Sequence, residues 1–196
     1  VFECKKLAFR NIPSTMRTTA GRIMTLNDTF KTYLDKRILW VFLMGCASGF
    51  PWVLIGSAMS GWLKDAGLTR TAIGLFGSIF AVYAINFLWA PLIDRVRVPI
   101  LGILGQRRGW IIGTQLIMLI LTVSIATVDP ANSLMMTSVL ALGIASASAT
   151  QDIAVDAYRI DHFADSPKHQ LPAASAMAVI GWWTGYSLPG YVAFRY

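Results

Sequence analysis

Charged side chains are scarce in this sequence of 196 residues. They make up 14% of it, whereas a soluble domain usually carries about a quarter. No charge lies within residues 38–63, 71–93 or 109–128. An uncharged apolar run of about 20 residues can cross the hydrocarbon core as a helix, because a helix satisfies its own backbone groups there. A soluble helical core would interrupt such runs with polar positions at every turn. The sequence therefore predicts an all-α membrane protein.

Cysteine is also scarce, and the two residues present exclude a disulfide framework. Cys4 lies in the polar N-terminal stretch and Cys46 inside the first apolar run, and no metal-ligand spacing accompanies them. A recognisable nucleic-acid-binding motif is missing, and the net charge of +7 comes from basic residues between the apolar runs. We therefore expect the lipid bilayer as a partner, and no nucleic acid, metal or cofactor.

The apolar runs that are present predict about five transmembrane helices. The expected spans cover about residues 38–63, 72–93, 110–128, 133–157 and 171–193, joined by short connections. Residues 1–37 are expected to form a basic cytoplasmic tail. Because the chain starts with Val1, Met16 or Met24 is an alternative native start, and the first part of the tail would then not be translated.

The distribution of Lys and Arg predicts the orientation of these spans. The N-terminal tail holds eight of them, the connection after the second span four, and the connection after the fourth span two. The opposite side holds only Lys64 and Arg70. Because basic residues are concentrated in cytoplasmic loops, the N-terminus is expected in the cytoplasm.

The first span contains polar and helix-perturbing residues near its middle. Ser48, Gly49 and Pro51 lie there, and a proline removes a backbone hydrogen bond and kinks the helix. Interrupted helices near the midplane indicate transporter binding sites. The alternative is a packing kink with small residues for close helix contact.

The fourth span contains acidic residues at helical spacing. Ser148, Asp152, Asp156 and Arg159 share one helical face, and Gln151 adds a further polar group. Asp152 is expected about 10 Å to the cytoplasmic side of the span's middle. An acid there costs on the order of 2.5–3.5 kcal/mol unless it is paired or faces water.

Two interpretations of this acidic face stay open. In the functional one, the face lines a cavity and Asp152 contacts substrate or couples protons. In the structural one, Asp152 neutralises a basic group elsewhere, while Asp156 and Arg159 form an interfacial pair. An enzyme acting on a lipid-linked substrate through Asp152 and Asp156 is disfavoured, because no nucleophile–base constellation accompanies these acids.

Polar residues also occur in the second span. Tyr83 and Asn86 could face a cavity or bond a neighbouring helix.

The connection between the second and third spans resembles a known signature. Asp94-Arg95 followed by Arg107-Arg108 is similar to the cytoplasmic gating loop of the major facilitator superfamily, with extra residues between its halves. More specifically, four collinear stretches resemble the AmpG-type muropeptide permeases and their acetyl-CoA transporter relatives. They are Ser48-Gly-Phe-Pro51, Phe87-Leu-Trp-Ala-Pro-Leu-Ile-Asp-Arg95, Arg107-Arg-Gly-Trp110 and Ser148-Ala-Thr-Gln-Asp-Ile-Ala-Val-Asp-Ala-Tyr-Arg159.

This resemblance implies the N-terminal portion of a major-facilitator-type helical bundle. It implies a proton-linked symporter of the bacterial inner membrane that imports anhydromuropeptides, which are amino-sugar peptides, for cell-wall recycling. In that superfamily the first and fourth helices line the central cavity. The resemblance also implies further C-terminal helices, so we expect the present chain to be a fragment or truncated frame.

Two departures from the family pattern bear on the cargo. The muropeptide permeases carry Lys where this chain has Asn86. They carry Arg within a Gly-Tyr-Arg-Leu-Gly stretch where this chain reads Gly181-Trp-Trp-Thr-Gly185. A sibling carrier for another substrate, such as a siderophore, and a non-transporting remnant of such a permease are therefore alternatives.

Overall fold

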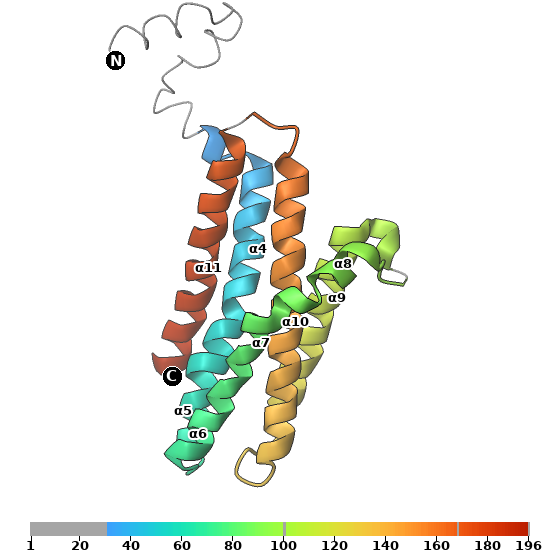
Figure 1. Ribbon diagram of the computed structural model, residues 1–196. Coiled ribbons are helices and arrows are strands. Elements are labelled where there is room, and N and C mark those ends of the chain that lie inside the picture. Colours follow the sequence, from blue (N-terminus) through green and yellow to red (C-terminus); the bar gives the residue numbers. More distant parts are fainter. Residues whose placement is uncertain (1–30, 100, 168, 196) are drawn as a thin grey trace, which may run out of the picture.

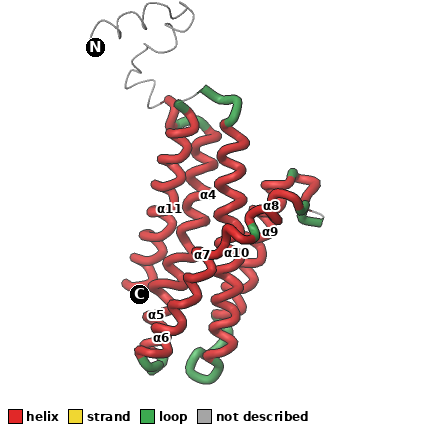
Figure 2. The backbone as a smooth tube through the Cα atoms, viewed as in Figure 1, coloured by secondary structure: helices red, strands yellow, loops and turns green. Residues whose placement is uncertain are grey.

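The computed structural model is a bundle of long helices, and it describes residues 31–99, 101–167 and 169–195 (Figure 1). Most of the predicted tail, residues 1–37, lies outside the described residues. Every regular element in the described part is a helix (Figure 2). The structure therefore confirms the predicted all-α class.

Four stretches of the described chain are long and apolar enough to cross a membrane. The first, Lys36–Asp65, comprises α4 (Lys36–Val53), η1 (Leu54–Ala58) and α5 (Met59–Asp65). The second, Arg70–Leu88, comprises α6 (Arg70–Gly77), η2 (Ser78–Phe80), α7 (Ala81–Ile85) and η3 (Asn86–Leu88). The third and fourth are the single helices α9 (Gln106–Ile125) and α10 (Leu134–Phe163). The fifth long helix, α11 (Gln170–Arg195), has 26 residues and no charge before Arg195. At 1.5 Å per residue it is also long enough to span the bilayer.

The first span stays helical through the proline at its middle. Asp35 caps α4 by accepting a hydrogen bond from the backbone N–H of Arg37, and the helix continues past Pro51 to Val53. A π-helical turn, η1, follows directly. The perturbation expected around Gly49 and Pro51 therefore takes the form of a widened turn after the proline, a feature often found at functional sites.

The second span is segmented, whereas the sequence predicted one run over 72–93. Two 3₁₀ turns, η2 and η3, interrupt it, and the short helix α8 (Ala90–Arg95) follows. Pro91 lies in the first turn of α8, where its missing N–H is tolerated, but it cannot continue a helix from the preceding turn. Figure 1 shows these segments running obliquely across the bundle, with α8 turned away from the long helices.

The helix α10 is longer than predicted and lies at the centre of the packing. It runs to Phe163 instead of ending near 157, so the expected loop from Tyr158 is helical at first. It packs against α4, α7, α9 and α11. Thr137, Ser148 and Gln151 are buried along it.

Glycines hold α4 and α11 in backbone contact. A Cβ atom at Gly49 would overlap the carbonyl oxygen of Trp182, and one at Gly185 would overlap that of Cys46. Gly45 and Gly181 make equally close approaches, so each helix presents a Gly-x-x-x-Gly pair to the other. Such pairs let transmembrane helices approach until backbone meets backbone.

Two buried apolar clusters lie toward opposite ends of this assembly. One contains Ile38 of α4 with Phe163 of α10 and Ala174 of α11. The other contains Ile55 of η1 and Ile144 of α10. The polar residues of the first and fourth spans lie between them along the helices.

Candidate functional site

The acidic face of α10 meets polar side chains from two other helices. Asp152 is half-buried, and the hydroxyl of Ser48 on α4 is its neighbour. Tyr83 of α7 lies beside Ser148 of α10 and within electrostatic reach of Asp152. The fold thus brings together Ser48, Tyr83, Ser148 and Asp152, which the sequence placed in three separate spans.

Several polar atoms of this group are buried and form no hydrogen bond of good geometry in the described part of the chain, although Ser48 lies beside Asp152 and Ser148 beside Tyr83. The atoms are Ser48 Oγ, Trp52 Nε1, Tyr83 OH, Ser148 Oγ and Asp152 Oδ1. Buried polar groups in proteins are nearly always paired, and the exceptions call for a ligand, water or a functional explanation. We refer to these five residues as the polar cluster. It combines donors and a carboxylate acceptor, which suits a polar ligand or a transferable proton.

Aromatic rings line one side of the polar cluster. The ring of Trp52 lies 4.6 Å from that of Tyr83, 5.0 Å from that of Phe80 and 5.7 Å from that of Trp182, measured between centroids. Tyr186 stacks on Trp182 at 5.6 Å, and its hydroxyl lies 3.2 Å from that of Ser57. The wall therefore joins α4, the second span and α11.

A cavity of about 460 Å³ lies beside the far end of this wall. Val53, Ser57 and Tyr186 line it, together with Arg195 at the end of α11. Ser57 and Tyr186 thus lie where the aromatic wall meets this cavity.

Other predicted site residues have different surroundings. Gln151 is 1% exposed and accepts a hydrogen bond from Thr114 of α9 at 3.5 Å, so it joins two helices. Gly49 and Pro51 are buried in α4, and Gly49 faces α11. Asn86 is half-buried at the start of η3.

The charged residues further along α10 pair with each other. Asp156 and Arg159 form an ion pair of 2.9 Å, and the Asp156 side chain is mostly exposed. Asp152 forms no ion pair in the described residues, and the charged group that acts on it electrostatically is Asp156, a like charge. The structure thus gives Asp152 no basic neighbour that would make it a purely structural partner.

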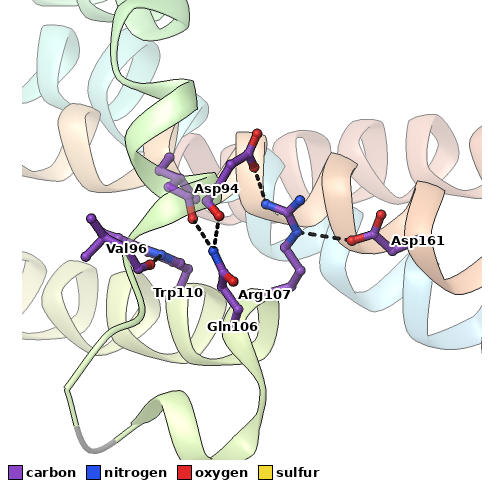
Figure 3. A network of polar contacts seen from close by, with 7 residues as sticks. Asp94, Val96, Gln106, Arg107, Trp110 and Asp161 are labelled. Atoms are coloured by element: carbon purple, nitrogen blue, oxygen red, sulfur yellow. Dashed lines mark hydrogen bonds and ion pairs between the residues drawn. The ribbon is translucent and has the colours of Figure 1, made fainter.

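The predicted signature loop forms a polar network at the end of the bundle (Figure 3). Arg107 lies between two carboxylates: it pairs with Asp94 of α8, and its Nε donates to Asp161 of α10 at 3.1 Å. Gln106 donates to the carbonyl oxygens of Ile93, at 3.0 Å, and of Asp94. The network ties α8 and the start of α9 to α10.

A second contact fixes the loop between these helices. Trp110 Nε1 donates to the carbonyl oxygen of Val96 at 2.8 Å, so the loop is pinned to α9 at both of its ends. Arg95 is exposed at the end of α8. Arg108 lies apart from the network, over the ring of Tyr158.

Two participants were missed by the sequence analysis. Asp161 was assigned to a loop, because the helix was expected to end before it. Trp52 carried a usable signal, since it lies four residues after Ser48 and thus on the same helical face. No group of three or more potential metal ligands occurs in the part of the chain that the structure describes.

Comparison with known proteins decides the family. The family described as Acetyl-coenzyme A transporter 1 matches residues 38–195. The chain belongs to this family. The sequence resemblance to the AmpG-type permeases and their acetyl-CoA transporter relatives is thereby confirmed.

Individual relatives agree with this assignment. The chain is 34% identical over 160 residues to the Putative transporter AmpG 4 of Rickettsia felis, which covers 82% of this chain and 38% of the relative. It is 32% identical over 163 residues to the Anhydromuropeptide permease of Escherichia coli K12, which covers 83% of this chain and 32% of the permease. The chain spans about a third of the length of these curated relatives. No solved structure matches.

The family and the apolar helices together establish a multi-pass membrane protein of a transporter family. The named relatives are a transporter and a permease.

Proposed function

We propose that these helices form part of a proton-linked secondary transporter of the bacterial inner membrane that imports anhydromuropeptides or related small conjugates for cell-wall recycling. The observation that carries the proposal is the polar cluster around Asp152, where five buried polar atoms of the described residues form no hydrogen bond of good geometry. The name of the Escherichia coli relative supports the substrate class. The Lys and Arg distribution supports a cytoplasmic N-terminal tail.

In this proposal Asp152 is the proton acceptor. Its position between Ser48 and the Tyr83–Ser148 pair gives the proton a path of hydroxyl groups, and no cation in the described residues holds the carboxylate permanently ionised. An intramembrane acid without a basic partner is a functional candidate by default, because its burial is costly.

The network around Arg107 is proposed to gate the cytoplasmic end. Arg107 joins Asp94 to Asp161, so it holds α8 against α10 in this conformation. Opening of the cytoplasmic end would break the ion pairs of Arg107 with Asp94 and Asp161 and replace them with other contacts. Arg95 and Arg108 belong to the same loop and would find new partners in the other state. In this proposal further helices of the carrier form the rest of the transport pathway, because this chain spans only about a third of the length of the relatives.

A specific observation favours a second candidate, a sibling carrier with another cargo such as a siderophore. The two positions where the muropeptide permeases carry cations hold Asn86, which is half-buried, and Trp183, which is 58% exposed. An anionic conjugate would lose two counter-charges at these positions. A non-transporting remnant is the remaining alternative.

An uptake assay separates these candidates. The gene that encodes this chain, with its native neighbours, is expressed in a bacterial strain lacking its own permease, and uptake of radiolabelled anhydromuropeptide is measured with and without a protonophore. We expect uptake that the protonophore abolishes. Uptake of a labelled siderophore alone would select the sibling carrier, and a stable membrane protein that takes up neither would favour the remnant.

A further inference from the structure

A basic pocket lies between α4, α9 and α10 at the end of the bundle that also holds the Arg107 network. Its volume is about 540 Å³. Lys36, Arg37 and Arg108 line it together with the rings of Trp40, Tyr158 and His162, and none of its lining residues is acidic. The proposed orientation places this end in the cytoplasm.

The positive charge of this pocket is not neutralised within the described residues. Arg107 and Arg159 are held by aspartates, whereas Lys36, Arg37 and Arg108 form no ion pair there. The carboxylate of Asp35 caps α4 instead of pairing with a side chain.

Aromatic stacking holds Arg108 in the pocket. Its guanidinium lies 5.9 Å from the centroid of the Tyr158 ring, and Tyr158 stacks on His162 at 5.3 Å with an interplanar angle of 13°. The stack limits the positions open to the guanidinium, so a phosphate would meet a partly ordered donor instead of a freely rotating one.

The same three helices line a second, mostly apolar cavity, and we refer to the inner side of the basic pocket and this cavity together as the cleft. Met44, Ile111 and Ile112 line the inner side of the basic pocket. The second cavity has a volume of about 170 Å³; most of its lining is apolar, including Leu54 and Leu119, and Gln115 and Thr122 are its polar members. From Met44 to Leu54 the helix rises roughly 15 Å, which is about half of a hydrocarbon core of roughly 30 Å. The cleft therefore has the length of one leaflet.

We propose that this site binds an anionic phospholipid, with its phosphate at Lys36, Arg37 and Arg108 and one acyl chain in the cleft. Basic pockets between transmembrane helices on the cytoplasmic side are suited to such head groups. A free phosphate would leave the apolar cleft empty, and a zwitterionic lipid would leave the pocket's charge unbalanced. The site is separate from the polar cluster and does not depend on which cargo is carried.

Native mass spectrometry of the purified chain tests this. The protein in detergent is incubated with an equimolar mixture of phosphatidylglycerol and phosphatidylcholine, and the retained lipid is quantified. We expect preferential retention of phosphatidylglycerol. The variant K36Q/R108Q should weaken this retention roughly fivefold for each charge removed. The matched control R70Q/R97Q removes the same net charge outside the pocket and should retain the preference.

Three results would overturn the proposal. These are equal retention of the two lipids, equal loss in the control variant, and displacement of the lipid by millimolar inorganic phosphate. A thermal-unfolding scan of each variant shows whether it is folded, and Arg108→Lys, which keeps the charge, should retain most of the binding.

Discussion

The side chain of Arg107, at the start of α9, reaches the end of α10, where its Nε donates a hydrogen bond to Asp161 at 3.1 Å. The same guanidinium pairs with Asp94. The Arg107 side chain is only 24% exposed while both aspartates are largely exposed, so the arginine is the shared and most buried of the three charged groups.

Replacing this arginine should loosen the end of the bundle. Arg107→Gln removes two ion pairs that are worth about 0.2–1 kcal/mol each when exposed. We expect a lower melting temperature in detergent, and Arg95→Gln, at an exposed position outside the network, should leave it unchanged. Equal melting temperatures for the two variants would contradict the bridging role.

The contact between α4 and α11 should not tolerate a side chain at Gly185. Gly185→Leu places atoms where the backbone of Cys46 lies, so the helices must separate, at a cost of roughly 1–3 kcal/mol or more. The measurement is the yield of folded protein in membranes. Gly77→Ala is the control, because a Cβ there meets nothing within 4 Å. Normal yield of Gly185→Leu would show that the contact is dispensable.

Asp152 should be required for uptake by the assembled carrier. Asp152→Asn keeps the shape and removes the exchangeable charge, so proton-driven uptake should fall to background while membrane insertion persists. Asp156→Asn changes an exposed acid on the same helix and should retain most of the uptake. Unchanged uptake in Asp152→Asn would refute the coupling role.

The indole N–H of Trp52 should contribute to ligand binding. Trp52→Phe preserves an aromatic ring but removes an unpaired buried donor, and one hydrogen bond is worth about 0.5–1.5 kcal/mol, or roughly 2- to 12-fold in affinity. We expect the substrate concentration for half-maximal uptake to rise by such a factor. Trp62→Phe, at the far end of the first span, is the control and should leave that concentration unaltered.

Labelling of Cys4 can report the orientation of the N-terminus. Cys4 belongs to the tail, and Cys46 lies within the first span. A membrane-impermeant maleimide should label Cys4 in inverted vesicles but not in intact cells, and Cys4→Ser should abolish that signal. Labelling of Cys4 in intact cells would place the N-terminus outside.

The long helices could be predicted because the sequence marks them by missing charge. The end of α10 could not be predicted. Asp161 and His162 are polar and so resemble a loop, but a helix that leaves the hydrocarbon core can continue with polar residues. The 3₁₀ turns of the second span contact α10. Pro91 indicates only the break between η3 and α8, and no residue type in the sequence predicted η2.

The polar cluster was partly predictable. Helical spacing assigned Ser148 and Asp152 to one face of a single helix, but no local pattern states which helix will face it. The pairing with Ser48 and Tyr83 is set by tertiary packing. For the same reason Gln151, adjacent to Asp152 in sequence, was grouped with it although it bonds α9.

The glycine contact between α4 and α11 has a consequence for motion. Two helices whose backbones touch along two Gly-x-x-x-Gly pairs cannot slide past each other without steric overlap. We therefore expect Ser48, Trp52 and Trp182 to move together when the helices rearrange. In the proposed transport cycle, a change of access to Asp152 that arises among the described helices would then involve the second span, where two 3₁₀ turns interrupt the α-helical hydrogen bonding.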